Sequence, residues 1–312
     1  MTVVTGSLMR AMEKVARTFR LGDLLDLPVY AGRGELGLIW RLDTDGGSWA
    51  VKELLSSVDE GVARADTAFQ HAAADAGVRL PRPVLTRTGS VLLRGRFRVY
   101  EWVDLVAGEQ VTGAELGAVT ARLHRVGHPA SGTVPPWFSE PVGRAGWQAL
   151  LAAGGEWEQA LGRVLPELIA LDDLVVAPDG GPITTCHCDV GVENVRRAAD
   201  GGVIVLDWEN CGPARPGWEL AKILVDLPED EAVAAYSAYR ASGGPEVISG
   251  PGDFSMAIAE HGHLLDFYAR RALSEQESPD NRARARDRVS TMLSRPLTTK
   301  RIDALLAALR RP

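Results

Sequence analysis

The sequence predicts an α+β protein with a small antiparallel sheet near its N-terminus and a mainly helical remainder. Two observations lead to this fold class. Residues 27–54 contain three short apolar stretches, separated by a glycine-rich run and an Asp-Gly-Gly turn, which is typical of antiparallel hairpins. From residue 113 onward, apolar residues recur mostly at helical spacing.

Composition limits the possible classes of protein. The chain has 312 residues, 46% of them hydrophobic and 24% charged, which suits one large or two medium domains with a substantial core. A formal net charge of -7 disfavours nucleic acid as the main partner and is compatible with a cationic substrate. No stretch resembles a signal peptide or a membrane span, and an odd count of three cysteines suits a reducing compartment. We therefore expect a soluble cytoplasmic protein without a membrane partner.

The glycine-rich run lies between two of the expected strands. It places Gly32, Gly34 and Gly37 in a GxGxxG pattern, where missing side chains permit close approach to the backbone. A dinucleotide fingerprint would need a helix directly afterwards, whereas residues 38–42 continue as a strand. The third strand then carries Lys52. An ordinary glycine-rich hairpin and a solvated strand lysine are the alternatives.

The other elements follow from periodicity and helix-ending signals. An amphipathic helix is expected over residues 8–21, where Gly22 ends it. The charged stretch 278–288 is expected to be a mobile surface stretch. Further helices are expected over residues 59–76, 113–125, 147–174, 253–273 and 298–310, and the third of these should be broken or bent near Pro166.

The segment TTCHCDVGVENVRRAADGGVIVLDWE, residues 184–209, concentrates the polar chemistry. Asp189 and Asn194 lie in a loop-like stretch, and Asp207 ends a β-branched apolar strand. A carboxylate there must be paired or bind a metal, because burying a bare charge is costly. Phosphoryl transfer needs a carboxylate that accepts a hydroxyl proton and hard oxygen ligands for Mg²⁺. Asp189 is therefore the candidate base, and Asn194 and Asp207 are the candidate metal ligands, with turn residues and a strand-end cap as alternatives.

This segment resembles the catalytic and metal-binding loops of the aminoglycoside phosphotransferase and choline kinase group, distant relatives of protein kinases. The resemblance rests on His187-x-Asp189 followed by Asn194, and on Asp207-Trp208-Glu209 after an apolar strand. The stretch Trp218-Glu219-Leu220-Ala221 is similar to the Asp-Leu-Ala of that group. The strand, glycine loop, strand, turn and strand that carry Lys52 also match the kinase arrangement.

The resemblance implies a protein-kinase-like two-lobed fold, with a nucleotide-binding N-lobe over residues 1–102, a catalytic and acceptor-binding C-lobe over 103–312, and a hinge near 101–108. It implies that Lys52 holds the α- and β-phosphates while the three loop glycines cover them. The adenine would meet backbone groups of the hinge, for which we select Glu101, Trp102 and Val103.

A helix carboxylate pairs with the strand lysine in this group. Asp66 is the first candidate and Glu60 the second, although the group usually has Glu. Structural support is expected from three further residues, His187, Glu209 and Glu219. Glu260 and Asp266 could meet a cationic acceptor, with a solvated helix face as the alternative.

The sequence thus predicts Mg²⁺-dependent transfer of the γ-phosphate of ATP or GTP to a hydroxyl of a small molecule. The preferred acceptor is an aminoglycoside-type or other cationic antibiotic, as in antibiotic resistance. One alternative is a metabolite kinase of choline, homoserine or sugar type. A second is a nucleotide-binding regulatory protein without catalysis, which the presence of Lys52, Asp189, Asn194 and Asp207 disfavours.

Overall fold

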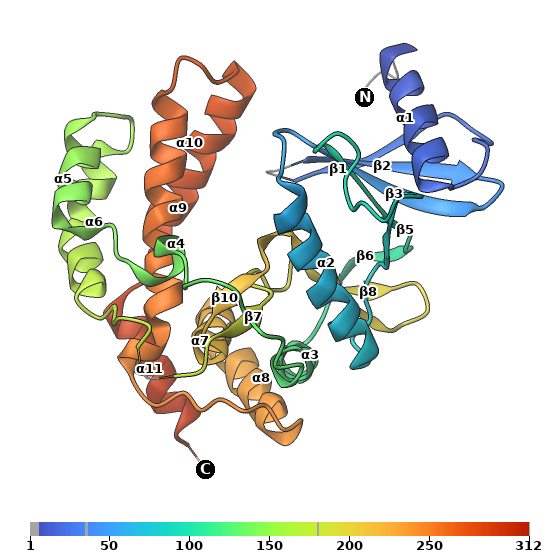
Figure 1. Ribbon diagram of the computed structural model, residues 1–312. Coiled ribbons are helices and arrows are strands. Elements are labelled where there is room, and N and C mark those ends of the chain that lie inside the picture. The colour runs from blue at the N-terminus through green and yellow to red at the C-terminus, as the bar shows by residue number, and fades with distance from the viewer. Residues whose placement is uncertain (1–5, 35–36, 180, 312) are drawn as a thin grey trace. The chain divides into compact units, whose positions relative to one another are not determined.

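The computed structural model describes residues 6–34, 37–179 and 181–311 (Figure 1). The chain forms two compact units. The first comprises Met1–Val111 and Asp189–Cys211, and the second comprises Thr112–Cys188 and Gly212–Pro312. The functional lobes at residues 1–102 and 103–312 stay a prediction.

The first unit contains a five-stranded antiparallel sheet in the order β1-β2-β3-β5-β4. Its strands are β1 (Val29–Arg33), β2 (Gly37–Thr44), β3 (Gly47–Leu54), β4 (Pro83–Val84) and β5 (Phe97–Glu101). Helix α1 (Gly6–Phe19) lies beside this sheet (Figure 1). Its apolar stripe, including Met12, Val15 and Phe19, packs in one core with Trp40 and Val51.

A second sheet of the same unit brings in residues far along the chain. It has the order β6-β8-β9, formed by β6 (Leu105–Gln110), β8 (Val195–Ala198) and β9 (Val203–Val205). The short helix η1 (Trp208–Asn210) follows it, and Trp208 packs edge-on against Phe69 of α2 (Glu60–Asp75) at 5.6 Å between ring centroids. The expected strand before Asp207 is confirmed by β9.

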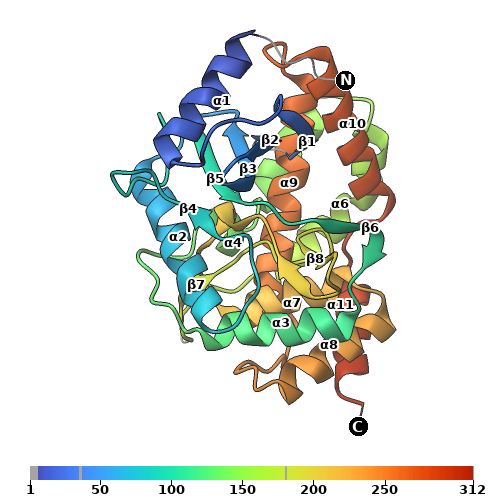
Figure 2. The same cartoon turned by 90° about the vertical axis from the view of Figure 1, so that its right-hand side faces the viewer.

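The second unit is mainly helical. Its two strands, β7 (Thr184–Cys186) and β10 (Gly212–Ala214), form an antiparallel pair. Helices α9 and α10 lie side by side, as do α3 and α8 (Figure 2). The helices are α3 (Gly113–Arg125), α4 (Pro136–Ser139), α5 (Gly143–Ala152), α6 (Glu158–Asp172), α7 (Pro216–Asp226), α8 (Glu229–Ala241), η2 (Pro251–Phe254), α9 (Ser255–Leu273), α10 (Pro279–Ser294) and α11 (Thr299–Leu309).

The charged stretch 278–288 corrects one expectation. It forms most of α10 instead of a mobile surface stretch. Ala285, Val289 and Leu293 recur at a spacing of four residues and are buried in one core with residues of α5, α6 and α9. A narrow apolar stripe of this kind suffices because neighbouring helices supply the rest of the core.

Substituting Gly117 should destabilise the second unit. An added Cβ at Gly117 of α3 would lie 1.9 Å from the carbonyl oxygen of Ala235 on α8. We expect Gly117→Ala to lower the free energy of unfolding by about 1–3 kcal/mol, because the two helices must separate. Gly162→Ala on α6 is the control, since its Cβ would meet only Leu151 at 4.0 Å. That change should stabilise by up to about 1 kcal/mol. Urea unfolding of both variants measures the contrast, and equal stability of the two would contradict the close packing.

Candidate active site

Lys52 on β3 forms two ion pairs inside the first unit. Its Nζ lies 2.6 Å from Oδ1 of Asp207 and 2.8 Å from Oε2 of Glu209, and the Lys52 side chain is only 8% exposed. Burial alone would lower the pKa of Lys52, but Glu209 and Asp207 raise it above its usual value. The ammonium is therefore held charged at a fixed place.

The carboxylate of Glu209 in η1 has several polar and charged partners. Besides Lys52, the Tyr100 hydroxyl donates to it at 3.0 Å, and Arg98 lies 4.0 Å away. Burial by itself would raise the pKa of Glu209, but Lys52, Asp207 and Arg98 bring it below its usual value. Burial and the neighbouring Glu209 raise the pKa of Asp207 to about 7 in spite of Lys52.

Asp66 is not placed as expected. The Oδ2 atom of Asp66 lies 3.2 Å from Nη1 of Arg98, and both side chains are 2% exposed. Arg98 is the residue directly opposite Lys52 on the neighbouring strand β5. Glu60, the second candidate, accepts hydrogen bonds from two backbone N–H groups near residue 91. The expected partner of Lys52 is thus corrected to Glu209 together with Asp207. Asp66 on α2, whose side chain is shorter than that of Glu, pairs with Arg98 instead.

The charges of this cluster do not balance. Two cationic side chains, Lys52 and Arg98, face three carboxyl groups, Asp66, Asp207 and Glu209. Burial raises the pKa of Asp66 to about 7 against the opposing effect of Arg98. If all five groups are ionised, one negative charge is left over, which suits a further cation.

The loop after β7 holds Asp189 by amide groups. Nδ2 of Asn194 donates to the Asp189 carbonyl at 2.9 Å and to its Oδ2 at 3.0 Å. Nδ2 of Asn210 donates to the same carboxylate oxygen at 3.3 Å. Because Nδ2 of Asn194 is engaged, its Oδ1 is the end of the amide that can accept or bind a metal. The sequence patterns did not predict a role for Asn210. Its position directly after Asp207-Trp208-Glu209 is the one feature that could have indicated it.

Asp207 has an unusual backbone. Its φ is 60°, in the left-handed region that residues other than glycine seldom adopt. Its side chain is 41% exposed, against 9% for Glu209. Carboxylate and amide oxygens are the ligands that Mg²⁺ prefers, so the exposed Asp207 carboxylate and the Asn194 amide oxygen suit that ion chemically.

The glycine loop joins β1 to β2. The N–H of Gly34 donates to the Gly37 carbonyl at 2.9 Å and closes the turn, while residues 35–36 lie outside the described residues. An added Cβ at Gly37 would come 2.9 Å from the Glu53 carbonyl oxygen and 3.3 Å from Cγ of Lys52. Glycine at this position therefore lets the loop approach the lysine strand. A Cβ at Gly32 or Gly34 would meet nothing within 4 Å.

The expected hinge residues end β5 and precede β6. The N–H of Glu101 donates to the Arg82 carbonyl at 2.9 Å, and that of Trp102 donates to the Ser48 carbonyl at 3.1 Å. Val103 follows directly in the chain. Since two of the three N–H groups serve the sheet, any adenine contact by an N–H of this group would fall to Val103.

The expected supporting residues His187 and Glu219 lie in the second unit and are fully buried. Glu219 on α7 accepts from the N–H of Cys188, and its Oε2 lies 2.8 Å from Nε2 of His124. The other ring nitrogen of His124 lies 2.9 Å from the Tyr239 hydroxyl. Burial would raise the pKa of Glu219, but His124, His187 and the Cys188 N–H lower it. Glu219 thus holds the residue that immediately precedes Asp189 in the chain.

The two residues considered for the acceptor both form ion pairs within α7 and α9. Oε2 of Glu260 lies 2.9 Å from Nζ of Lys222, with both side chains largely buried. Asp266 pairs with Arg270 one turn away at 2.8 Å. Their part in acceptor binding stays a prediction.

Another set of potential metal ligands is internally satisfied. Among the described residues, His124, Cys186 and Glu219 place one ligand atom each within 4.8 Å of the others. His124 and Glu219 are hydrogen-bonded to each other, and Cys186 Sγ contacts the Ala214 carbonyl at 3.7 Å. This buried set is accounted for by hydrogen bonding.

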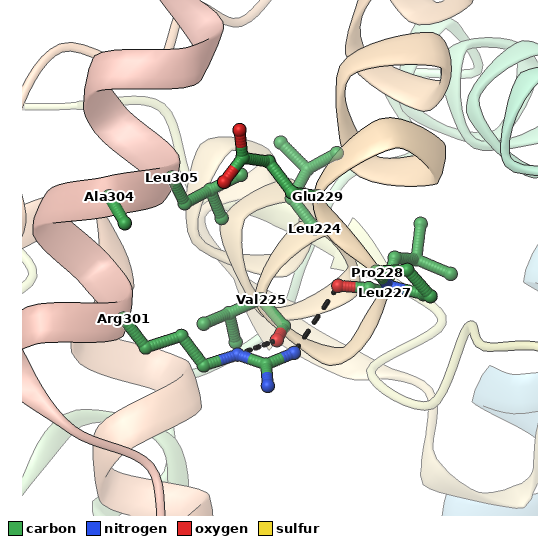
Figure 3. A pocket seen from close by; sticks show the side chains of 8 residues that line it. All are labelled: Leu224, Val225, Leu227, Pro228, Glu229, Arg301, Ala304 and Leu305. Carbon is green, nitrogen blue, oxygen red and sulfur yellow. Dashed lines mark hydrogen bonds between the residues drawn. The ribbon is translucent and has the colours of Figure 1, made fainter.

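A cavity of about 180 Å³ lies between the α7–α8 junction and α11 (Figure 3). Arg301 donates from Nε to the Val225 carbonyl at 2.8 Å and from Nη2 to the Leu227 carbonyl at 3.2 Å. These bonds satisfy carbonyl groups at the end of α7. The cavity is therefore a feature of helix packing, and its lining contains no candidate site residue. It is lined by Leu224, Val225, Leu227, Pro228, Glu229, Arg301, Ala304 and Leu305.

Comparison with solved structures supports the fold. The spectinomycin phosphotransferase APH(9)-Ia, in complex with ADP and spectinomycin, is similar at a TM-score of 0.68 and 13% identity, with 99% of each chain covered. A choline kinase from Streptococcus pneumoniae has a TM-score of 0.59 and 15% identity, covering 93% of this chain and 99% of its own. A macrolide 2'-phosphotransferase type I has a TM-score of 0.56 and 17% identity, with 93% and 99% covered. The predicted protein-kinase-like α+β fold is confirmed.

Comparison with protein families supports the resemblance. A search of curated proteins finds no match. Among the described residues, no helix is long and apolar enough to cross a bilayer. The model of the phosphotransferase enzyme family matches residues 31–254, which is more than half of the chain. The chain therefore belongs to the phosphotransferase enzyme family, as a small-molecule phosphotransferase with hydroxyl acceptors.

Proposed function

We propose that the protein transfers the γ-phosphate of ATP or GTP, with Mg²⁺, to a hydroxyl of a cationic antibiotic of the aminoglycoside type. The observation that carries this proposal is the arrangement within one unit of Lys52, held by Glu209 and Asp207, and of Asp189, held by Asn194. The net charge of -7 favours a cationic acceptor. A structural relative crystallised with ADP and spectinomycin further supports this acceptor class.

Nucleotide binding would use the ammonium of Lys52 and the glycine loop between β1 and β2. Lys52 is protonated and positioned, so it suits the α- and β-phosphates. Gly32, Gly34 and Gly37 would let the loop lie close over the phosphates, and the backbone of residues 101–103 would meet the base. Mg²⁺ would be held by Asn194 and Asp207, where it supplies charge neutralisation for the phosphates. The exposed carboxylate of Asp207 suits such a cation.

Asp189 would accept the proton of the acceptor hydroxyl. Two amide groups donate to one of its carboxylate oxygens and thereby orient the second oxygen. Catalysis of this kind depends on positioning and on charge neutralisation more than on covalent chemistry. His187 and Glu219 would support the stretch that leads into Asp189, since Glu219 accepts from the N–H of Cys188. Glu260 is paired with the largely buried Lys222, whereas Asp266 is paired with the exposed Arg270, so we place an acceptor contact on Asp266 first.

A metabolite kinase is the second candidate function. Structural relatives include a choline kinase and a microcompartment-associated aminopropanol kinase, whose names indicate small amino alcohols as acceptors. For both candidate functions, we propose that the protein acts in the cytoplasm.

The first experiment measures nucleotide consumption with Mg²⁺ and ATP or GTP against aminoglycosides, other cationic antibiotics, amino alcohols and sugars. Stimulation by amino alcohols or sugars alone would favour the metabolite kinase, and nucleotide binding without turnover would favour a regulatory protein.

Asp189→Asn should remove transfer while sparing nucleotide binding. We expect kcat to fall about 100- to 10,000-fold, because the proton acceptor is lost, with an unchanged nucleotide dissociation constant by calorimetry. Glu193→Gln, a change at an exposed position of the same loop, is the control and should behave as wild type. Turnover near the wild-type value in Asp189→Asn would exclude the role given to Asp189.

Asp207→Asn should raise the Mg²⁺ concentration needed for nucleotide binding by roughly tenfold, because one anionic ligand is lost. A Mg²⁺ titration of nucleotide affinity measures this shift. Asp200→Asn changes an exposed carboxylate of the same unit that pairs with Arg79, so its Mg²⁺ dependence should match wild type. If Asp207→Asn also matched wild type, the ligand assignment would be wrong.

Glu209→Gln should raise the KM for nucleotide by roughly tenfold, since Lys52 loses its most buried partner. Asp66→Asn should raise that KM less, because Asp66 contacts Arg98 rather than Lys52. Steady-state kinetics of the two variants at saturating acceptor make the comparison. A larger effect from Asp66→Asn would restore the helix carboxylate as the anchor of Lys52.

A further inference from the structure

Cys188 has a strained backbone directly before Asp189. Its φ is 63°, in the left-handed region that residues with a side chain seldom adopt. Such a conformation persists only where its surroundings determine it. Here both polar groups of the Cys188 backbone are bound by charged side chains of one helix, α7.

The two charged side chains are Glu219 and Lys222. They lie three residues apart, so they project from the same face of the helix. Glu219 accepts from the Cys188 N–H, and Nζ of Lys222 donates to the Cys188 carbonyl at 3.1 Å. Glu219 belongs to the stretch that resembles the Asp-Leu-Ala of the family, with Glu in place of the more frequent Asp. Lys222 was not singled out by any sequence pattern.

Lys222 is itself held in place. Its side chain is 11% exposed, and its Nζ lies 2.9 Å from Oε2 of Glu260 on α9, which is 14% exposed. A buried lysine without a carboxylate partner would be costly. Glu260 therefore pairs with the ammonium and directs it at the carbonyl, which is a structural use for a residue first considered for acceptor binding.

The bound carbonyl belongs to the peptide group that joins Cys188 to Asp189. That group is planar, so its oxygen, the Asp189 nitrogen and the Asp189 Cα move together. Holding the oxygen sets the direction in which the chain enters Asp189, and with it the direction of the carboxylate.

We propose that Lys222, oriented by Glu260, is a positioning residue for phosphoryl transfer: it holds the Cys188 carbonyl and thereby aims Asp189 at the acceptor hydroxyl. This inference rests on the proposed role of Asp189. Lys222 acts through the loop backbone and touches no substrate.

The test compares Lys222→Met with the double variant Lys222→Met/Glu260→Met. The single variant removes the lysine that lies 2.9 Å from the buried Glu260 carboxylate, so it loses both stability and position. The double variant replaces a buried ion pair by apolar side chains of similar length, which is often neutral for stability. We expect the double variant to recover the thermal stability lost in the single variant. Its kcat should stay about 100-fold below wild type, with an unchanged KM for nucleotide.

A second measurement follows the carbonyl itself. Cys188-Asp189 is the single Cys-Asp pair in the sequence. Protein labelled at cysteine carbonyl carbons and aspartate amide nitrogens with NMR-active isotopes therefore gives one correlation for this peptide group. The Cys188 carbonyl resonance should move upfield in both variants, because a charged hydrogen-bond donor is lost. Arg311→Met/Glu229→Met removes an exposed ion pair of the same unit and should change neither kcat nor this resonance.

Two outcomes overturn the proposal. One is a double variant that recovers wild-type kcat together with wild-type stability, since Lys222 would then matter only for folding. The other is a Cys188 carbonyl resonance that does not move when Lys222 is replaced. A wild-type protein that transfers phosphate neither to an acceptor nor to water would contradict the proposed function instead. The resonance would still decide whether Lys222 holds the loop.

Discussion

The ion pair between Lys52 and Glu209 is the interaction on which the proposed site depends. It joins the third strand of the first sheet to the short helix after β9, although the two residues lie far apart in the sequence. Arg98 and Tyr100 on the neighbouring strand approach the same carboxylate. Because buried charges are costly unless paired, each member of the cluster has one favourable place. The lysine is thereby positioned by partners within its own unit.

Both proposed reactive carboxylates have a strained backbone at or next to them. Asp207 has a φ of 60°, and Cys188, directly before Asp189, has a φ of 63°. In each case charged groups bind the strained stretch: Lys52 pairs with Asp207, and side chains of α7 bind both backbone groups of Cys188. Strain of this kind commonly marks functional sites, where side-chain direction matters more than local stability. One face of α7 thus binds the backbone of Cys188 as well as contributing to the core.

Local patterns explain which predictions were confirmed. The hairpin before Lys52 follows from glycine, a tight turn and alternating strands, and all of these act between near neighbours. The strand before Asp207 was visible for the same reason. The charged stretch 278–288 was misjudged because Ala285 is its one buried residue, and the apolar stripe of the helix continues beyond it through Val289 and Leu293. A segment with so narrow an apolar stripe is stable as a helix only because adjacent helices cover the stripe. The composition of the segment does not show that those helices are there.

The sequence by itself determined the chemistry available to the site: a lysine on a strand after a glycine loop, an aspartate and an asparagine in one loop, and an acidic pair after an apolar strand. Spacing within one segment is enough for that, since the loop is local. Only the tertiary structure decided which charges meet. Asp66 pairs with Arg98, Glu209 takes Lys52, and Lys222 reaches the loop before Asp189. Which charged groups pair depends on their distance and burial in the folded chain. These quantities involve several elements at once, so no single segment of the sequence predicts them.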